Sequence, residues 1–219
     1  MKNGLLFILI LLLFSCTAHH SLQPVGRGNW SGNVGFGGPF VSAFDTYIPV
    51  PYLTAGTTVG IRENINLDGN LHLFPLAYQV AGLDIGTAWF PTIQNRLKPT
   101  LGLQSRLMVL ASVKRDVPER FRFIPILTPT AAWRIKKGLI YTGMDWTLPL
   151  NSPDYNRDAP ATLVSPFLGY RWTLKRKLYL YTEIKWQAAN LPSENLAADY
   201  WPVQGYGAIS TLISIERGF

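Results

Sequence analysis

The sequence predicts an all-β fold, an antiparallel up-and-down transmembrane β-barrel of about ten strands, and three observations favour it. Between Leu178 and Gln187, apolar residues such as Ile184 alternate strictly with polar ones such as Glu183 and Lys185. This period of two is typical of a β-strand. The last residues of the chain alternate in the same way, and the strand-like segments are joined by short and long connections in turn.

Ten segments have the composition and length of strands. They are residues 30–38, 52–62, 65–74, 80–90, 98–110, 121–134, 138–148, 162–174, 177–189 and 206–219. Most are long enough for a tilted strand to cross the hydrocarbon layer of a membrane. An even number of strands, with short turns at one end and long loops at the other, is typical of single-chain membrane barrels.

The connections support this assignment. Residues 63–64, 91–97, 135–137 and 175–176 are short, whereas residues 39–51, 111–120, 149–161 and 190–205 are longer. The exception is the connection of residues 75–79, which is short although it belongs to the end with long loops.

The C-terminus points to a family of proteins. Ile209, Thr211, Ile213, Ile215 and the terminal Phe219 share one face of the last predicted strand. A chain that ends inside a strand on an aromatic residue resembles the bacterial outer-membrane β-barrels. The resemblance implies residence in the outer membrane of a Gram-negative bacterium, contact with outer-membrane lipid, and recognition of Phe219 by the barrel-insertion machinery. The short turns on one side and long loops on the other place both termini in the periplasm, as expected for such a barrel.

The N-terminus predicts export. Lys2 is followed by an apolar stretch from Leu5 to Phe14. This stretch is about half the length that a transmembrane helix needs, so a signal peptide is expected rather than an anchor helix.

The end of this stretch resembles a bacterial lipobox, with Leu13 and Ser15 placed before Cys16, the only cysteine of the chain. The resemblance implies cleavage before Cys16 and a lipid on its thiol. Cleavage after Ala18 is the alternative. We therefore expect a signal peptide over residues 1–15, an N-terminal tail over residues 16–28 and a barrel domain over residues 29–219.

The composition suits a barrel whose exterior faces lipid, with 47% hydrophobic, 13% aromatic and only 15% charged residues. It also suits a soluble periplasmic or surface lipoprotein with a β-sandwich or a lipocalin-like barrel, whose apolar face would point inward. The net charge of +7 arises from basic residues that are scattered or lie in short turns, so nucleic-acid binding is not expected. The tryptophans near predicted strand ends favour the membrane, where such residues form girdles at headgroup level; they are Trp89, Trp133, Trp146, Trp172 and Trp186.

Three prolines oppose a regular barrel, because proline cannot donate to a strand ladder. Pro125 and Pro166 would be tolerated at the outer rim. Pro129 lies deeper in its predicted strand and predicts a bulge or a shorter strand.

If the apolar faces point to lipid, the opposite faces fill the lumen with charges of both signs. The predicted lumen network consists of Arg62, Asp68, His72, Asp84, Arg106, Arg122, Arg134, Asp145, Arg171, Glu183, Lys185 and Glu216. Charges confined in this way must pair and form hydrogen bonds. The network either fills and rigidifies the interior or lines a polar path or binding cavity. A wide pore is not expected, because the interior of a barrel only slightly smaller is filled by side chains.

The enzymatic alternative rests on His72. Asp68 and Asp84 are expected beside it, and a histidine with a carboxylate can act as a general base. An outer-membrane hydrolase or acyltransferase is therefore the second hypothesis, but no serine is convincingly placed beside His72. A histidine held in the charge network is the simpler interpretation. One histidine and no cysteine in the barrel body fall short of the usual metal ligands, so neither a metal nor another cofactor is expected.

The loop that follows the first strand is apolar for an exposed loop, with Phe40, Phe44 and Tyr47, and Trp201 lies in the last long loop. These residues predict either an extension of the strand beyond the membrane or a contact with a lid or partner. The hypothesis that the sequence supports best is an integral outer-membrane barrel with a structural role, or one that passes or binds a small solute.

Overall fold

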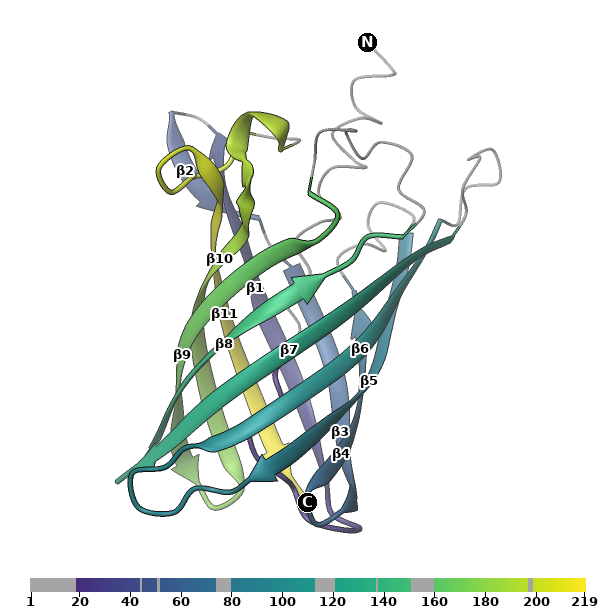
Figure 1. Ribbon diagram of the computed structural model, residues 1–219, viewed down its shortest axis with the longest axis vertical. Helices are drawn as coiled ribbons and strands as arrows, with labels where there is room; N and C mark the ends of the chain where they lie inside the picture. The colour runs from purple at the N-terminus through teal and green to yellow at the C-terminus, as the bar shows by residue number, and fades with distance from the viewer. Residues whose placement is uncertain are drawn as a thin grey trace.

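The protein is a closed antiparallel β-barrel of ten strands with one additional short strand, shown in Figure 1. The computed structural model describes residues 19–43, 45–50, 52–73, 80–112, 121–136, 138–150, 160–196 and 199–219. The strands are β1 (Trp30–Ala43), β2 (Thr46–Pro49), β3 (Tyr52–Arg62), β4 (Ile65–His72), β5 (Val80–Thr92), β6 (Thr100–Ser112), β7 (Phe121–Ile135), β8 (Gly138–Thr147), β9 (Leu163–Lys175), β10 (Leu178–Pro192) and β11 (Tyr206–Gly218).

Each barrel strand pairs with its neighbour in sequence, and the last strand closes on the first. The pairing of β1 with β11 runs from Ser31 opposite Gly218 to Pro39 opposite Ser210. All barrel pairings are antiparallel, so the predicted up-and-down topology and the count of ten strands are confirmed. The strands are strongly inclined to the long axis of the barrel in Figure 1, as closure of a sheet requires.

The barrel carries its apolar residues outside. In β10, Glu183 and Lys185 are buried, whereas Ile184 between them is 49% exposed. In β11, Ile213 and Ile215 are exposed and Ser214 is buried. The alternative of a soluble sandwich or lipocalin-like barrel is therefore wrong, since its apolar side chains would fill the interior.

The two ends of the barrel differ. The turns between β3 and β4, β5 and β6, β7 and β8, and β9 and β10 lie at one end, together with the C-terminus (Figure 1). We call this the short-turn end. Within the part of the chain that the structure describes, no helix is long and apolar enough to cross a membrane.

The prolines are accommodated without a bulge. Pairing of β7 with β8 stops after Leu127 opposite Trp146 and resumes in the same register at Thr130 opposite Gly143, so Pro129 interrupts the ladder locally. The bulge or shortened strand expected at Pro129 is wrong, because β7 stays paired with β6 along this whole stretch. Pro125 and Pro166 lie toward the long-loop end of their ladders, as predicted.

At the long-loop end, β1 continues beyond the barrel and turns back into β2 as a small hairpin. Phe40 pairs with Pro49 and Ala43 with Thr46. The last long loop is tied to this hairpin by hydrogen bonds from Ser42 N to Asp199 O, 2.7 Å, and from Trp201 N to Phe40 O, 3.0 Å. Residues 39–51 were expected to form a loop. Most of them instead belong to the extended end of β1 and to β2.

Candidate functional site

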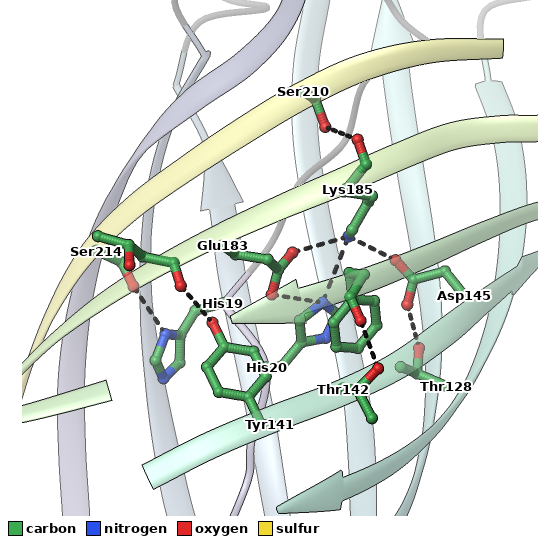
Figure 2. Close-up of polar contacts among 12 residues, drawn as sticks. His19, His20, Thr128, Tyr141, Thr142, Asp145, Glu183, Lys185, Ser210 and Ser214 are labelled. Carbon is green, nitrogen blue, oxygen red and sulfur yellow. Dashed lines mark hydrogen bonds and ion pairs between the residues drawn. The ribbon is translucent and has the colours of Figure 1, made fainter. Parts of the chain in front are cut away.

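The candidate site is the lumen, and a buried ammonium group lies at the centre of its charge network. Nζ of Lys185 donates to Oδ2 of Asp145 at 2.7 Å and lies 3.4 Å from Oε1 of Glu183. Nε2 of His20 lies 3.4 Å from the same Nζ and 3.6 Å from Oε2 of Glu183. Figure 2 shows Lys185 reaching between the two carboxylates from the wall, with the His20 ring beside them. Four ionisable groups from two strands and the N-terminal tail therefore share one buried position.

A second polar cluster lies on the side formed by β3 to β6. Nε2 of His72 lies 2.8 Å from Oδ2 of Asp84, and Nδ1 of His72 lies 2.5 Å from the hydroxyl of Tyr52. Asn70 donates to the other oxygen of Asp84 at 2.8 Å. Alternation along each strand points these side chains inward, and the antiparallel register brings them to one height.

Asp68 and Arg106 extend this cluster around the wall. Asp68 accepts hydrogen bonds from the Thr58 hydroxyl at 2.7 Å and from Nε2 of Gln104 at 3.0 Å. One guanidinium nitrogen of Arg106 lies 3.8 Å from Asp145, so Arg106 connects the two halves of the network. The carboxylates are thus paired or accept hydrogen bonds, as buried charges must be.

The N-terminal tail enters the lumen. Residues 19–25, which we call the lumen segment, run along the inside of the wall, and His19, His20, Ser21 and Leu22 are all buried. At the short-turn end, Gly28 N donates to Gly60 O at 2.8 Å. From there toward its N-terminal residues the segment lies deeper in the lumen. His20 contacts Lys185, which lies seven residues from the start of β10 at the short-turn end.

Polar contacts with the wall seat the lumen segment. Nδ1 of His19 lies 3.1 Å from the hydroxyl of Ser214, and its Nε2 lies 3.5 Å from Glu216. Asn66 binds the segment three times: Nδ2 donates to Ser21 Oγ at 2.7 Å and to Gln23 O at 3.0 Å, and Oδ1 accepts from Val25 N at 3.1 Å. One wall asparagine therefore fixes both the path and the direction of the segment.

One apolar side chain anchors the same segment. Leu22 is 3% exposed and belongs to a cluster with Ala132, Leu139, Tyr141, Phe167 and Tyr181. The ring of His20 also stacks on Phe167, with centroids 4.3 Å apart and planes within 8°. The tail therefore combines a small apolar contact with a larger polar one.

Two arginines hold the segment near its exit. Oε1 of Gln23 accepts from Arg171 at 2.8 Å and lies 3.5 Å from a guanidinium nitrogen of Arg134. The Arg171 guanidinium also lies over the ring of Tyr179, 4.5 Å from its centroid. A cavity of about 310 Å³ opens beside these groups and is lined by the lumen segment and by the short-turn ends of several strands.

Several buried polar atoms of the wall have no hydrogen-bond partner among the described residues. They include Thr54 Oγ1, Asn70 Oδ1, Gln104 Oε1 and two guanidinium nitrogens of Arg106. These four side chains lie on β3, β4 and β6, and His20 Nδ1 and the carboxylate oxygens of Glu183 in the Lys185 cluster likewise form no hydrogen bond with described residues. Buried polar groups in native proteins have partners as a rule, so the lumen offers hydrogen-bonding capacity to water or a polar solute on more than one side.

Most of the residues predicted for the lumen network do lie inside. Asp68, His72, Asp84, Arg106, Asp145, Arg171, Glu183, Lys185 and Glu216 are buried. Arg122 is half-buried near the long-loop end of β7. Arg62 and Arg134 are exposed, because each lies within one residue of the short-turn end of its strand. Their placement in the lumen interior is therefore wrong, although Arg134 borders the cavity.

His19, His20, Ser21 and Gln23 were not predicted as parts of the site. Their partners lie far away in sequence, up to 195 residues for His19 and Ser214. The pattern held one weak signal, which is that two of the three histidines of the chain stand together in a tail.

The geometry around His72 speaks against the enzymatic alternative. Both ring nitrogens are engaged, one by Tyr52 and the other by Asp84, and the imidazole is 1% exposed. The expected neighbour Asp84 is in contact, whereas Asp68 binds Thr58 and Gln104 instead. Within the described residues, no group of three or more His, Cys, Asp or Glu side chains is arranged to hold a metal ion.

The aromatic residues at the long-loop end cluster with each other. The ring of Trp201 lies 5.7 Å from that of Phe40 and 5.5 Å from that of Tyr47, and the latter pair is stacked. Phe44, the fourth residue of the predicted contact, lies outside the described residues. A partner at this surface stays a prediction.

No protein-family model and no curated protein matches the chain. Solved structures do match it. An outer-membrane channel from Pseudomonas putida F1 is 9% identical, with a TM-score of 0.48 over 93% of this chain and all of that one. The translocator domain of the autotransporter NalP from Neisseria meningitidis is 10% identical, with a TM-score of 0.46 over 89% of each chain. The outer-membrane protease OmpT from Escherichia coli is 10% identical, with a TM-score of 0.43 over 93% of this chain and all of that one. At these identities the likeness concerns the barrel alone.

Proposed function

We propose that this chain is an integral outer-membrane β-barrel that passes small polar solutes, and that its lumen segment closes the path. The observation that carries the proposal is the seat of residues 19–25 inside the lumen, against a wall of polar and charged side chains. A barrel of about eight strands, slightly smaller than this one, has its interior just filled by its own side chains. Here a part of the interior is filled by a chain segment that reaches it through the short-turn end.

The exterior supports the membrane location. Exposed leucines and isoleucines lie along the strands, and Trp30, Trp89 and Trp172 lie near the short-turn end with exposures of 48%, 48% and 39%. Aromatic residues at this position are typical of the girdle at lipid headgroup level. We accordingly place the short-turn end in the periplasm and the hairpin of β1 and β2 outside the cell.

The contacts of the lumen segment support a reversible closure. They are mainly hydrogen bonds and histidine contacts, which water can replace when the segment leaves. The wall that would then be uncovered includes Asn66, Glu216 and Arg171. Because it carries charges of both signs, it suits small polar or zwitterionic solutes better than apolar ones.

Conductance across a planar lipid bilayer tests the proposal. Residues 19–25 are replaced by a Gly/Ser sequence of equal length, which keeps the distance to the signal-peptide cleavage site. The native chain should conduct rarely and the substituted chain persistently. Leu22→Met is the matched control, because it conserves the volume of the anchor and should behave like the native chain.

Membrane fractionation and heat-modifiable gel mobility establish that both proteins are inserted barrels. If the substituted barrel is inserted but conducts no more than the native one, the passage is refuted. A purely structural role would then be the better interpretation.

A further inference from the structure

We infer that the short-turn end of the barrel binds anionic phospholipid headgroups through a ring of cationic side chains. The inference rests on the proposed placement of this end at the periplasmic leaflet of the outer membrane. Six exposed residues of three turns form this ring, which we call the basic collar: Arg96, Lys98, Lys136, Lys175, Arg176 and Lys177.

The collar follows the short-turn rim from β5 to β10, and exposed arginines lie along the rest of that rim. Its residues come from the β5–β6, β7–β8 and β9–β10 turns, which lie together at the lower end in Figure 1. Arg27, Arg62, Arg134 and Arg217 are exposed at the same end, before β1 or near the ends of β3, β7 and β11. The β5–β6, β7–β8 and β9–β10 connections therefore carry cations, and at the β3–β4 turn, which consists of Glu63 and Asn64, the cation is Arg62 at the end of β3.

The collar residues form no ion pair within the part of the chain that the structure describes. Among the described residues, Glu63 is the one exposed acidic side chain at the short-turn end. At the opposite end the exposed charged residues that the structure describes are acidic, namely Asp45, Glu194 and Asp199. Among the exposed residues that the structure describes, positive charge is thus concentrated at the short-turn rim.

The position of the collar fits the headgroup layer. Lys175 follows the exposed Trp172 by three residues, and Lys136 follows Trp133 by three. Three residues of a strand span about 10 Å along its axis, and less along the membrane normal when the strand is inclined. If the tryptophans lie at the border of the hydrocarbon, the cations lie among the phosphates, because each headgroup layer is about 5–7 Å thick.

An acidic periplasmic protein is a weaker alternative for the same charges. Such a partner would need only a patch on one side, whereas the collar extends along the rim from β5 to β10 and adjoins the exposed Trp89 and Trp172. Clusters of lysine and arginine next to a membrane-spanning segment attract anionic lipids, by about 1 kcal/mol per cation near the surface. The chemical class we assign is therefore a phosphate-bearing lipid headgroup with a net negative charge.

Fluorescence quenching by brominated lipids tests the inference on the complete, membrane-inserted barrel. The reporter background carries Trp146→Phe, Trp186→Phe and Trp201→Phe, so that emission comes from the tryptophans near the short-turn end. Bilayers contain phosphatidylcholine and phosphatidylglycerol in equal amounts, with one or the other lipid brominated. The ratio of the two quenching efficiencies reports which lipid is enriched beside the collar.

We expect anionic lipid to be enriched over phosphatidylcholine beside the collar by at least about fivefold. An attraction of about 1 kcal/mol by a single cation already corresponds to that factor. The triple variant Lys98→Gln, Lys136→Gln and Lys175→Gln removes one charge from each of three turns and should clearly lower the ratio, although Arg96, Arg176 and Lys177 keep their charges. The matched control, with Asp45→Asn, Glu194→Gln and Asp199→Asn, changes as many charges at the other end and should keep the enrichment. Sodium chloride near 1 M should reduce the enrichment by screening.

Two results would overturn the inference. One is an equal quenching ratio for the native collar and the triple variant. The other is the absence of any lipid preference together with collar-dependent binding to an acidic periplasmic protein or to peptidoglycan. Heat-modifiable mobility of each variant shows whether the barrel is inserted, and the conductance experiment does not depend on the collar. Failure of this inference is thus distinguishable from failure of the proposed function.

Discussion

Leu22→Asp should release the lumen segment without unfolding the barrel. Leu22 is 3% exposed and packs in the cluster around Tyr141 and Phe167. Burial of a leucine side chain contributes about 1.5–3 kcal/mol, and a carboxylate in its place would be desolvated as well. Each polar contact of the segment contributes about 0.5–1.5 kcal/mol. The free energy lost with the Leu22 side chain is therefore comparable to that of at least one such contact.

The shift of the equilibrium follows from these values. A loss of about 2 kcal/mol corresponds to about a 30-fold increase in the released population, since about 1.4 kcal/mol corresponds to a factor of ten. The barrel strands keep all their pairings, because Leu22 belongs to none of them. The thermal midpoint of the barrel should therefore change much less than the exposure of the segment.

Thiol labelling measures this shift. In a Ser21→Cys background, a maleimide polymer should react with the buried position 21 only when the segment leaves the lumen. The labelling rate of the Leu22→Asp variant should exceed that of its parent by about 30-fold, and Leu22→Met should stay close to the parent. Rates within about threefold of each other, in barrels that remain inserted, would refute the argument that Leu22 anchors the segment.

Three further results are expected. Lys185→Met should destabilise the barrel by about 3–5 kcal/mol in urea unfolding, because it leaves buried carboxylates without their cation, and neutralising those carboxylates as well should restore much of the stability. Ile184→Arg should hinder insertion by about 2–4 kcal/mol if it faces lipid, whereas unchanged insertion would contradict that orientation. Intact mass should show a mature chain that begins at Cys16 and carries a lipid on its thiol, as the resemblance to a lipobox implies; a lipid-free chain that begins at His19 would instead show cleavage after Ala18.

Substitution of His72 distinguishes a structural role of this histidine from a catalytic one. His72→Ala should lower the thermal midpoint by leaving Asp84 and Tyr52 without their shared partner, at a cost of about 1–3 kcal/mol. Tyr52→Phe removes one hydroxyl from the same chain of contacts and should have a smaller effect. If His72→Ala instead keeps full stability and abolishes hydrolysis of a lipid or peptide substrate, the enzymatic hypothesis replaces the structural one.

The strand pattern was readable from the sequence because side chains alternate with a fixed period of two. The segments expected at residues 52–62 and 121–134 agree with β3 and β7 to within one residue. The inward orientation of Glu183 and Lys185 followed from the same alternation. The errors arose near strand ends. Arg134 keeps the inward phase but is exposed at the end of β7, and a register shift before Arg62 places it opposite Ile65 on the outward face.

The position of the tail could not be predicted. Its contacts join His20 to Lys185 and Gln23 to Arg171, and no local pattern encodes pairs that lie 165 or 148 residues apart. The basic collar is a different case. The alternation of short and long connections already placed its turns at one end, and closure of the sheet decided only how they follow one another around the rim.

The sequence by itself determined the barrel, the number of its strands and the faces that point to the membrane and to the lumen, because these depend on a repeat that each strand carries alone. Only the tertiary structure decided which buried charges meet, that Lys185 lies between Asp145 and Glu183, and that the lumen holds residues 19–25 of the same chain. These features depend on the register and the closure between β1 and β11, which place distant residues at the same height inside one narrow space.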